Sequence, residues 1–240
     1  MNVLIVHAHP EERSFNGALR DAAVAEIERS GHEAALSDLY GMRFGAAGGP
    51  EDFTTPLNPD LFHYQSEQFA AAKNGTFVEE IAREQDKLRR ADILILQFPL
   101  WWGGPPAILK GWIDRVCAYG VTYADGTRFE RGLFRGRRAM ISVTTGGTPQ
   151  RFSDAGGYGD LEKVLWPIQH LFLDYLGFEQ VPPHIGYAAA RLDQAERRQH
   201  IALLRERIRA LLSDDRPSPP FPSPEQIAAM VGDRNWSSKL

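Results

Sequence analysis

The chain has 240 residues, of which 31 are acidic and 27 are basic, so its formal charge is −4 at pH 7. Hydrophobic residues make up 43% of it, a composition typical of one globular domain with a sizeable core. The charge argues against nucleic-acid binding, the lone Cys117 excludes an intrachain disulfide and a thiolate zinc site, and no apolar run approaches the ~20 residues of a membrane span. We therefore expect a cytoplasmic domain whose 22 glycines, 16 prolines and 5 tryptophans fall in informative clusters.

The first part of the chain predicts two strands, two helices and a long insertion. Residues 3–6 are β-branched and aliphatic without a break, as in a strand covered on both faces, and they do not resemble a signal peptide. The Gly, Pro, Asp and aromatic residues of 40–77 are too many for an ordinary connection, so we expect a functional insertion. In chain order, the expected elements are a strand at 3–6, a helix between Ser14 and Gly31, a strand at 36–39, the insertion at 40–77 and a helix at 78–90.

The second part continues the alternation. The expected elements are a strand at 93–98, a helix from Pro105 to Val116, a strand at 139–143, a helix at 161–176, a strand at 178–181 and a last helix with the apolar stripe Ile201, Leu204, Ile208 and Leu211. Pro167 is expected to kink the helix at 161–176 if it falls beyond the first turn of that helix. The tail from Ser213 holds five prolines between Arg216 and Pro224, and we expect it to be extended and peripheral.

Strands that alternate with helices predict an α/β fold with a parallel sheet. Five strands favour the flavodoxin-like order 2-1-3-4-5 with helices on both faces, formed by a domain at 1–212 and followed by a proline-rich tail at 213–240. Ligands of such sheets bind outside the carboxyl ends of the strands, near the point where strand order reverses. The loops after the first, third and fourth strands should therefore form the site.

The loop after the first strand has the sequence His7-Ala8-His9-Pro10-Glu11-Glu12-Arg13-Ser14-Phe15-Asn16. It leads into a helix N-terminus, where backbone N–H groups favour an anion, and Arg13, Ser14 and Asn16 add donors suited to phosphate oxygens. Neither GxGxxG nor GxxxxGK[ST] is present, which excludes the common dinucleotide fingerprint and the P-loop. The alternative is an ordinary capped helix start. For His7 and His9 a hydrogen-bonding or packing role is favoured over metal ligation, and we expect no metal.

The loops after the third and fourth strands are rich in aromatic residues, hydroxyls and glycines. Trp101 and Trp102, followed by Gly103 and Gly104, suit a wall for a large planar ligand, although both could instead pack beneath the insertion. The segment Thr144-Thr145-Gly146-Gly147-Thr148-Pro149 offers backbone N–H groups to a polar edge, and a glycine-rich segment with Tyr158 follows. Together the three loops predict a site for a planar, phosphate-bearing cofactor, most simply a flavin.

These segments resemble the NAD(P)H quinone reductases of the flavodoxin-like fold, the DT-diaphorase group. The resemblance runs from Val3 to the last helix. Its most specific pieces are Arg13–Asn16, Phe98–Leu100 with Trp102, Pro106–Trp112, Thr144–Gly147 and Leu165–Gln169. It implies a homodimer with two sites at the subunit interface and non-covalently bound FAD. The long insertion fits FAD better than FMN, because a larger cofactor needs more covering.

The resemblance also implies the roles of individual residues. Those implied to bind the cofactor are His9, Ser14, Phe15, Asn16 and Ala18 at the pyrophosphate and ribityl chain, Pro99, Leu100, Trp101, Trp102, Gly103 and Phe152 at the isoalloxazine, Thr144, Thr145, Gly146 and Gly147 at its polar edge, and Arg197 near the adenine. Those implied in catalysis are Trp102, Gly146, Gly147 and Tyr158, and those at the substrate are Trp102, Tyr123, Phe152 and Tyr158.

The sequence departs from the better-known family members near this loop. They use a tyrosine and a histidine to stabilise the reduced flavin, where this chain has Phe152 and Tyr158. Phe152 can stack but cannot donate a hydrogen bond, and Tyr158 can donate but carries no positive charge, so a cation is absent from this pair. Gly103 stands where mammalian relatives have a bulky aromatic residue and should open the acceptor pocket. Tyr123 matches a tyrosine that reaches into the partner's site.

The expected activity is the transfer of two electrons from NADH or NADPH through FAD to a quinone or another planar acceptor, by a ping-pong mechanism in which the flavin supplies the redox chemistry. Azo and nitro compounds are expected as side acceptors. One alternative is a flavin-binding regulatory subunit of a potassium-efflux transporter, and another is a flavodoxin-like electron carrier.

Overall fold

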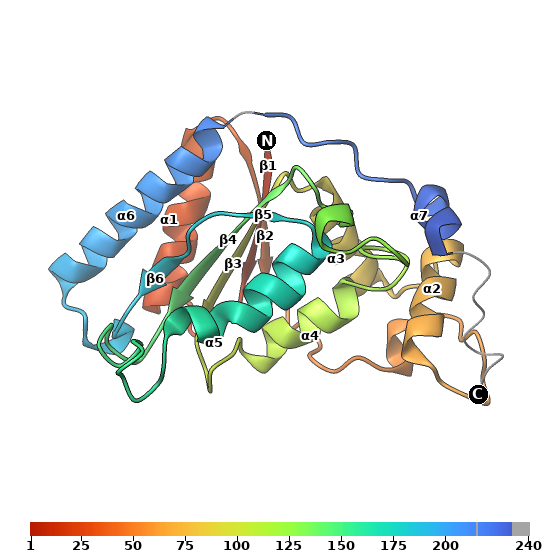
Figure 1. The fold of residues 1–240 in the computed structure, drawn as a ribbon, viewed down its shortest axis with the longest axis horizontal. Coiled ribbons are helices and arrows are strands. Elements are labelled where there is room, and N and C mark those ends of the chain that lie inside the picture. The colour runs from red at the N-terminus through yellow and green to blue at the C-terminus, as the bar shows by residue number, and fades with distance from the viewer. Residues whose placement is uncertain (215, 232–240) are drawn as a thin grey trace.

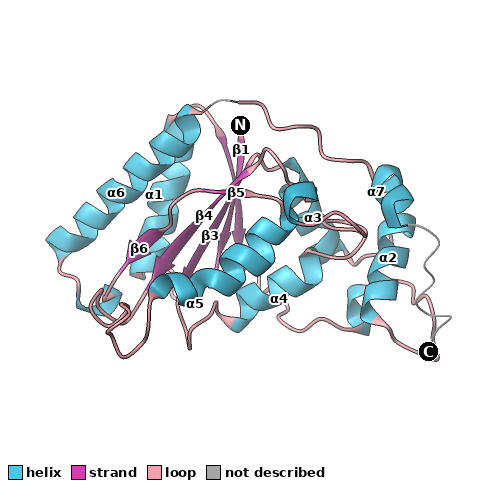
Figure 2. Cartoon of the chain, viewed as in Figure 1, coloured by secondary structure: helices cyan, strands magenta, loops and turns pink. Residues whose placement is uncertain are grey.

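The computed structural model describes residues 1–214 and 216–231, which form a parallel sheet between two layers of helices (Figures 1 and 2). The strands are β1 (Asn2–His7), β2 (Glu33–Asp38), β3 (Ile93–Pro99), β4 (Arg138–Thr144), β5 (Glu179–Gln180) and β6 (His184–Gly186). Their order is β2-β1-β3-β4-β5, with β6 also paired to β4. This confirms the predicted fold class and strand order.

The sixth strand was not predicted, and its origin is local. β5 pairs with Arg138 and Ala139 of β4, whereas β6 pairs with the stretch from Ser142 to Thr144 farther along the same strand. Pro182 and Pro183 stand between them, and a proline cannot donate to a ladder. One edge strand is therefore divided into two short ones.

The helices are α1 (Phe15–Arg29), α2 (Tyr64–Asn74), α3 (Glu79–Arg90), α4 (Ala107–Val116), α5 (Leu161–Ile168), α6 (Gln194–Ser213) and α7 (Pro224–Val231). Helices α1 and α6 cover one face of the sheet, and α3, α4 and α5 cover the other (Figure 1). Within the residues described, no helix is both long and apolar enough to cross a membrane.

Both faces of the central strands are buried, as the unbroken apolar runs predict. Val3 and Ile5 of β1 pack in the cluster formed with α1 and α6, while Leu4 and Val6 pack in the cluster formed with α3, α4 and α5. Each of these four side chains is at most 1% exposed. The side chains alternate between faces because successive residues of a strand point in opposite directions.

The helix predicted at 161–176 changes its winding part-way. Regular α-helix ends at Ile168, and residues Gln169–Asp174 continue as a π-helix. Pro167 lies inside α5 and cannot donate to the preceding turn. The predicted disturbance is therefore present, in the form of a wider helical turn directly after the proline.

The insertion is an ordered lobe rather than an irregular loop. It contains a 3₁₀ turn at Pro50–Asp52 and all of α2. Asp52 is 1% exposed; its carboxylate pairs with Arg115 of α4 at 2.8 Å and accepts a hydrogen bond from the Tyr64 hydroxyl at 2.5 Å. This buried pair fixes the lobe to the layer that covers the sheet.

The tail was expected to be extended and peripheral: residues 216–223 contain no helix or strand, but the expectation was wrong for Pro224–Val231. The chain after α6 crosses to the insertion and forms α7, which lies beside α2 (Figure 1). Ile227 and Val231 of α7 are 1% and 2% exposed, in a cluster with Tyr119 and Ala124. The missed signal is Ser223-Pro224-Glu225-Gln226: Ser223 Oγ accepts from the Gln226 N–H at 3.2 Å, and Gln226 Oε1 accepts from the Ser223 N–H at 2.8 Å.

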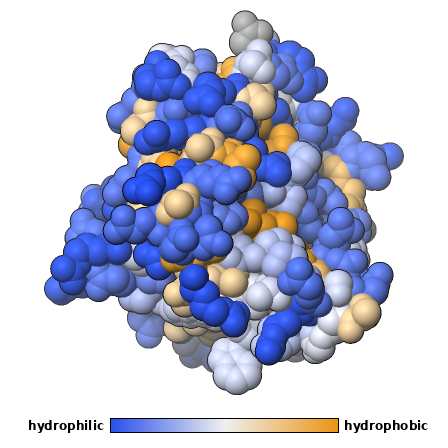
Figure 3. Space-filling view, turned by 90° about the vertical axis from the view of Figure 1, so that its left-hand side faces the viewer, coloured by the Kyte–Doolittle hydropathy of each residue, from blue (hydrophilic) through white to orange (hydrophobic). Residues whose placement is uncertain are grey.

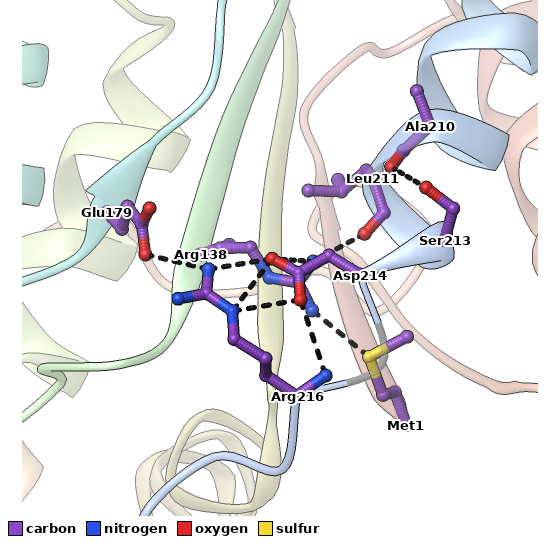
Figure 4. A network of polar contacts seen from close by, with 8 residues as sticks. All are labelled: Met1, Arg138, Glu179, Ala210, Leu211, Ser213, Asp214 and Arg216. Atoms are coloured by element: carbon purple, nitrogen blue, oxygen red, sulfur yellow. Dashed lines mark hydrogen bonds and ion pairs between the residues drawn. The ribbon is translucent and has the colours of Figure 1, made fainter.

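A polar network ties the start of the tail to the amino edge of the sheet (Figure 4). Arg138 of β4 donates to the Leu211 carbonyl at 2.6 Å, near the C-terminus of α6, and lies 3.7 Å from the Asp214 carboxylate. Arg216 pairs with Asp214 at 2.7 Å and reaches Glu179 of β5 at 3.4 Å. Arg138 is 6% exposed, so these contacts replace the water that its charge would otherwise need.

Two histidines are buried in the sheet. His7 is 0% exposed, and neither of its ring nitrogens has a hydrogen-bond partner among the residues described. His184 of β6 is 2% exposed. Burial is the main cause that lowers the pKa of each to about 4, so both are neutral at pH 7. His7 has a packing role, one of the two that the sequence favours for it.

This burial predicts a stability that depends on pH. The folded pKa of His7 lies below the unfolded value of about 6.5, so the unfolded chain binds more protons between these values, and the free energy of unfolding falls as pH drops from about 6.5 to about 4. His7→Leu has no such titration. The difference in free energy of unfolding, variant minus wild type, should therefore be about 2 kcal/mol larger at pH 5 than at pH 7.5, as measured by urea unfolding. Parallel pH profiles for the two proteins would contradict this.

Candidate active site at the carboxyl edge of the sheet

The carboxyl ends of β1, β3 and β4 lie level with one another. His7 is paired with Gln97, and Pro99 with Thr144. The loops that follow these strands therefore leave the same edge of the sheet, next to the N-terminus of α1. The structure thus brings together the three segments that the sequence singled out.

A buried chain of hydrogen bonds connects these segments. The Gln97 amide donates to Asn16 Oδ1 at 2.8 Å, and Asn16 Nδ2 donates to Thr144 Oγ1 at 2.8 Å. The three side chains are 1%, 4% and 3% exposed, respectively. Asn16, predicted as a cofactor ligand, thus has both ends of its amide engaged within the protein, and its side chain holds the start of α1 against β3 and β4.

Replacement of Asn16 should therefore destabilise the protein. In Asn16→Ala the buried Gln97 amide and Thr144 hydroxyl lose their partners, and we expect a loss of about 2–3 kcal/mol in the free energy of unfolding. Asn74→Ala, on the exposed end of α2, is the control and should change it by less than about 0.5 kcal/mol. Urea unfolding of the cofactor-free proteins measures both, and equal stabilities would show that the chain of hydrogen bonds contributes little.

The first turn of α1 is arranged as an anion site. Ser14 is the N-cap, and its Oγ accepts from the Gly17 N–H at 3.0 Å. The N–H groups of Phe15 and Asn16 have no acceptor within the helix, because they lie in its first turn. Arg13 has a side chain 91% exposed and only a 3.4 Å pair with Glu11, so it is free to turn toward a ligand.

Two further residues of this segment were predicted as ligands. Ala18 is exposed on the first turn of α1, and His9 is half-buried, with its ring 6.4 Å from that of Trp101. Gly17 was not among the predicted residues. A Cβ at this position would lie 2.0 Å from the Glu12 carbonyl oxygen, so only glycine lets the loop fold onto the helix start.

The loop after β3 forms a tight turn. The Trp101 and Gly104 N–H groups each donate to the other residue's carbonyl, at 2.9 and 3.0 Å. Trp102 and Gly103 between them have φ values of 51° and 75°. The left-handed conformation explains Gly103 and costs about 1 kcal/mol or more at Trp102. Trp101 is 42% exposed and Trp102 is fully exposed, so the alternative in which both pack beneath the insertion is wrong.

The residues before the tryptophans line the base of this turn. Pro99 is buried at the end of β3, and the Leu100 N–H donates to the Thr144 carbonyl at 2.8 Å. This bond continues the sheet by one residue beyond the named strands. The β3 and β4 loops are therefore held together where they separate from the sheet.

The loop after β4 is held by its own backbone. Thr145 is 2% exposed, and its Oγ donates to the Gly147 carbonyl at 2.8 Å. The Arg191 guanidinium donates to the Gly146 carbonyl at 2.6 Å. Among the described residues, no protein acceptor takes the N–H groups of Gly146 and Gly147. The loop therefore offers two donors to a ligand, as the sequence predicts.

Phe152 and Tyr158 lie against this loop. A Cβ on Gly147 would lie 2.7 Å from the Phe152 ring and 2.9 Å from the Tyr158 ring, so the glycine lets both rings approach. The rings are 5.2 Å apart between centroids, and Tyr158 is 52% exposed. The pair itself contains no cation, but Arg151, one residue before Phe152, donates to the Tyr158 hydroxyl at 3.0 Å.

The remaining predicted residues lie farther out. Arg197 is exposed on the first turn of α6, one turn before His200, whose ring lies 6.0 Å from that of Phe15. Tyr123 does not join the cluster in this chain: it packs against Tyr119 and Tyr175, with centroids 5.4 and 5.8 Å away, and burial raises its pKa to about 12.

The side of the molecule that bears α6 and the loop after β4 is mainly hydrophilic, with a narrow band of hydrophobic residues exposed between charged ones (Figure 3). The exposed rings of Trp101 and Trp102, with free N–H donors at a helix start and a turn, fit a ligand that has a planar ring and a phosphate-bearing chain. The geometry thus defines a flavodoxin-like protein with a site of the flavin type.

The comparisons with known proteins agree. The model of the flavodoxin-like fold family matches residues 1–212. The human ribosyldihydronicotinamide dehydrogenase [quinone] is 40% identical over 214 residues, which cover 89% of this chain and 93% of that protein. NAD(P)H dehydrogenase [quinone] 1 of Cavia porcellus is 39% identical over 206 residues, 85% of this chain and 75% of the relative.

Among solved structures, a candidate quinone reductase from Klebsiella pneumoniae has a TM-score of 0.83 and 42% identity, covering 88% of this chain and 85% of that one. The chain therefore belongs to the flavodoxin-like fold family, within its group of NAD(P)H quinone reductases. This confirms the resemblance on which the sequence-based expectations rest.

Proposed function

We propose that the protein is an FAD-dependent oxidoreductase that transfers two electrons from NAD(P)H to quinones or related planar acceptors. The observation that carries this proposal is the meeting of three loops at one edge of the sheet: a helix start with free N–H groups, an exposed tryptophan turn, and the Gly146–Gly147 donors. The names of the quinone dehydrogenase relatives support the same reaction class.

The donor set of this chain fits a flavin. The first turn of α1, with Ser14 and Arg13, would take the phosphates; the Gly146 and Gly147 N–H groups would take the polar edge of the ring; and Trp102 and Phe152 would cover its faces. When bound, the flavin would accept a hydride from the nicotinamide and pass the electron pair to the acceptor. The protein supplies alignment, hydrogen bonds and exclusion of water.

FAD is favoured over FMN by two features. His200 of α6, one turn after Arg197, has its ring 6.0 Å from that of Phe15 at the start of α1, so α6 would border an adenine half that extends there. The insertion is an ordered lobe that shares a buried apolar cluster with Ile81, Ala118 and Val121. A Bacillus anthracis protein titled an FMN-dependent NADH-azoreductase shares only the fold, at 18% identity and a TM-score of 0.59. Identification of the cofactor released on denaturation decides between FAD and FMN.

Tyr158 is the residue proposed to donate to the reduced cofactor. Its hydroxyl accepts from Arg151, and no acceptor for its own proton is found among the described residues. The O–H is therefore free to donate toward a ring at the Gly146–Gly147 loop. Phe152 lacks a hydroxyl and can contribute only stacking.

We expect the purified protein to be yellow and its flavin to be reduced anaerobically by NADH, NADPH or the dihydronicotinamide riboside named for its relatives. Tyr158→Phe should slow this reduction by roughly tenfold, because one hydrogen bond to the developing charge is worth about 1.4 kcal/mol. Stopped-flow absorbance of the flavin measures the rate. Tyr40→Phe, at the turn after β2, is the matched control and should reduce at the wild-type rate.

Three results would contradict the proposal. A colourless protein that gains no activity with added FAD or FMN excludes a flavoenzyme. A bound flavin that none of the three donors bleaches favours the electron carrier or the regulatory subunit of a potassium-efflux transporter. A reduced flavin that passes electrons to azo or nitro compounds but to no quinone would contradict the proposal that quinones are acceptors.

We also propose that the protein acts as a homodimer with sites at the interface. Trp166 of α5 and Leu171 of the π-helical segment are 49% and 53% exposed, which leaves an apolar surface on this side of the molecule. Leu171 and Tyr123 line the same cavity of about 480 Å³. A second subunit placed here would receive Tyr123 at its own site, as the resemblance implies.

The expected solution mass is therefore twice the 26.9 kDa of the chain. Leu171→Glu should shift the protein toward the monomer, because it places a charge in the apolar interface. Leu203→Glu makes the same change at another exposed leucine, on α6, and should leave the dimer intact. Sedimentation equilibrium measures both, and a monomeric wild type would contradict the proposal.

A further inference from the structure

The Arg151 side chain makes two contacts with Tyr158 and none with a carboxylate among the described residues. Its Nη1 donates to the Tyr158 hydroxyl at 3.0 Å, and its guanidinium carbon lies 5.5 Å from the centre of the Tyr158 ring. Its backbone carbonyl accepts from the Tyr158 N–H at 3.0 Å. Backbone and side-chain hydrogen bonds thus both join the two ends of this segment, and they fix the two side chains relative to each other.

The charge of Arg151 is not neutralised within the residues that the structure describes. No carboxylate oxygen lies within 4.0 Å of its guanidinium. The nearby acids have other partners: Asp154 pairs with Lys163 at 2.7 Å, and Asp160 accepts from the Glu162 N–H at the start of α5. The other cation at this loop, Arg191, bonds the Gly146 carbonyl.

This arrangement determines the direction in which Tyr158 can donate. A phenol oxygen that accepts from a guanidinium must direct its own proton elsewhere, and a charged donor on the oxygen polarises that O–H. The strengthened donor belongs to a residue that rests on Gly147, beside the two free N–H groups. A ligand that becomes negative at this loop would gain from all three donors.

We infer that Arg151 is a positioning residue that supplies, through Tyr158, the positive charge that stabilises the reduced cofactor. The inference rests on the proposed function. Two electrons and one proton, delivered as hydride by the nicotinamide, convert the neutral oxidised flavin ring into an anion, so a cation coupled to its donor favours the reduced form. Arg151 thereby takes the place of the charge that the Phe152 and Tyr158 pair itself lacks.

The experiment is a double-mutant cycle on the midpoint potential of the bound flavin, measured by equilibration with a reference dye. In Arg151→Met, the protein's affinity for reduced flavin relative to its affinity for oxidised flavin should fall about tenfold. For this two-electron couple, that lowers the midpoint potential by about 30 mV. Arg151→Lys should retain most of the wild-type potential. In the Tyr158→Phe background, Arg151→Met should change the potential by less than half as much, because its effect passes through the hydroxyl.

The control is Lys163→Met, which removes the same unit of charge from α5 and should leave the potential within a few millivolts of the wild type. Binding of oxidised FAD to the Arg151→Met protein, followed by flavin fluorescence, should match the wild type, since the lost interaction favours only the reduced form. This second measurement separates a positioning role from local damage to the loop.

The outcomes distinguish this inference from the proposed function. If the wild-type chain binds and reduces flavin but Arg151→Met leaves the potential unchanged, the inference alone is wrong. If Arg151→Met shifts the potential equally with and without the Tyr158 hydroxyl, the charge does not act through Tyr158 and the inference is again overturned. If the wild-type chain binds no flavin, the proposed function fails and the inference fails with it.

Discussion

The bonds from Gln97 to Asn16 and from Asn16 to Thr144 lie where the sheet becomes a binding surface. They join the ends of β3 and β4 to the first turn of α1, so the proposed phosphate-binding end and the proposed ring-binding end of the site have one common support. The loops above can be irregular because this support is buried and fully bonded. The Asn16 side chain thus holds the shape of the site, while its backbone N–H remains a candidate donor to a ligand.

Strain and exposure are concentrated on the ligand side of that support. Trp102 has a positive φ and a fully exposed ring, and Gly103 continues the same left-handed turn. Such a conformation persists in a folded protein when the neighbouring structure enforces it, here through the paired backbone bonds of Trp101 and Gly104. An unpaired aromatic surface next to free N–H groups is what a planar cofactor would cover.

The sequence predicts the sheet well because β1, β3 and β4 are uninterrupted apolar runs, and it predicts that the three loops meet because parallel strands end together. It fails where local composition misleads. The prolines between Arg216 and Pro224 suggested an extended tail, although Pro224 begins α7 inside a capping box and Ile227 closes an apolar cluster. It also missed Arg151 as the cation beside Tyr158, because a side-chain contact across seven residues of loop has no periodic signal.

The amino and carboxyl edges of the sheet hold residues with different roles. The amino edge holds Arg138, Asp214 and Arg216, which fasten α6 and the tail to the strands. The carboxyl edge holds the turn at Trp102 and the Arg151–Tyr158 segment, whose side chains take little part in the buried core. In the course of evolution, acceptor preference can therefore diverge by exchange of a few exposed loop residues, while selection on folding acts on a separate set of positions.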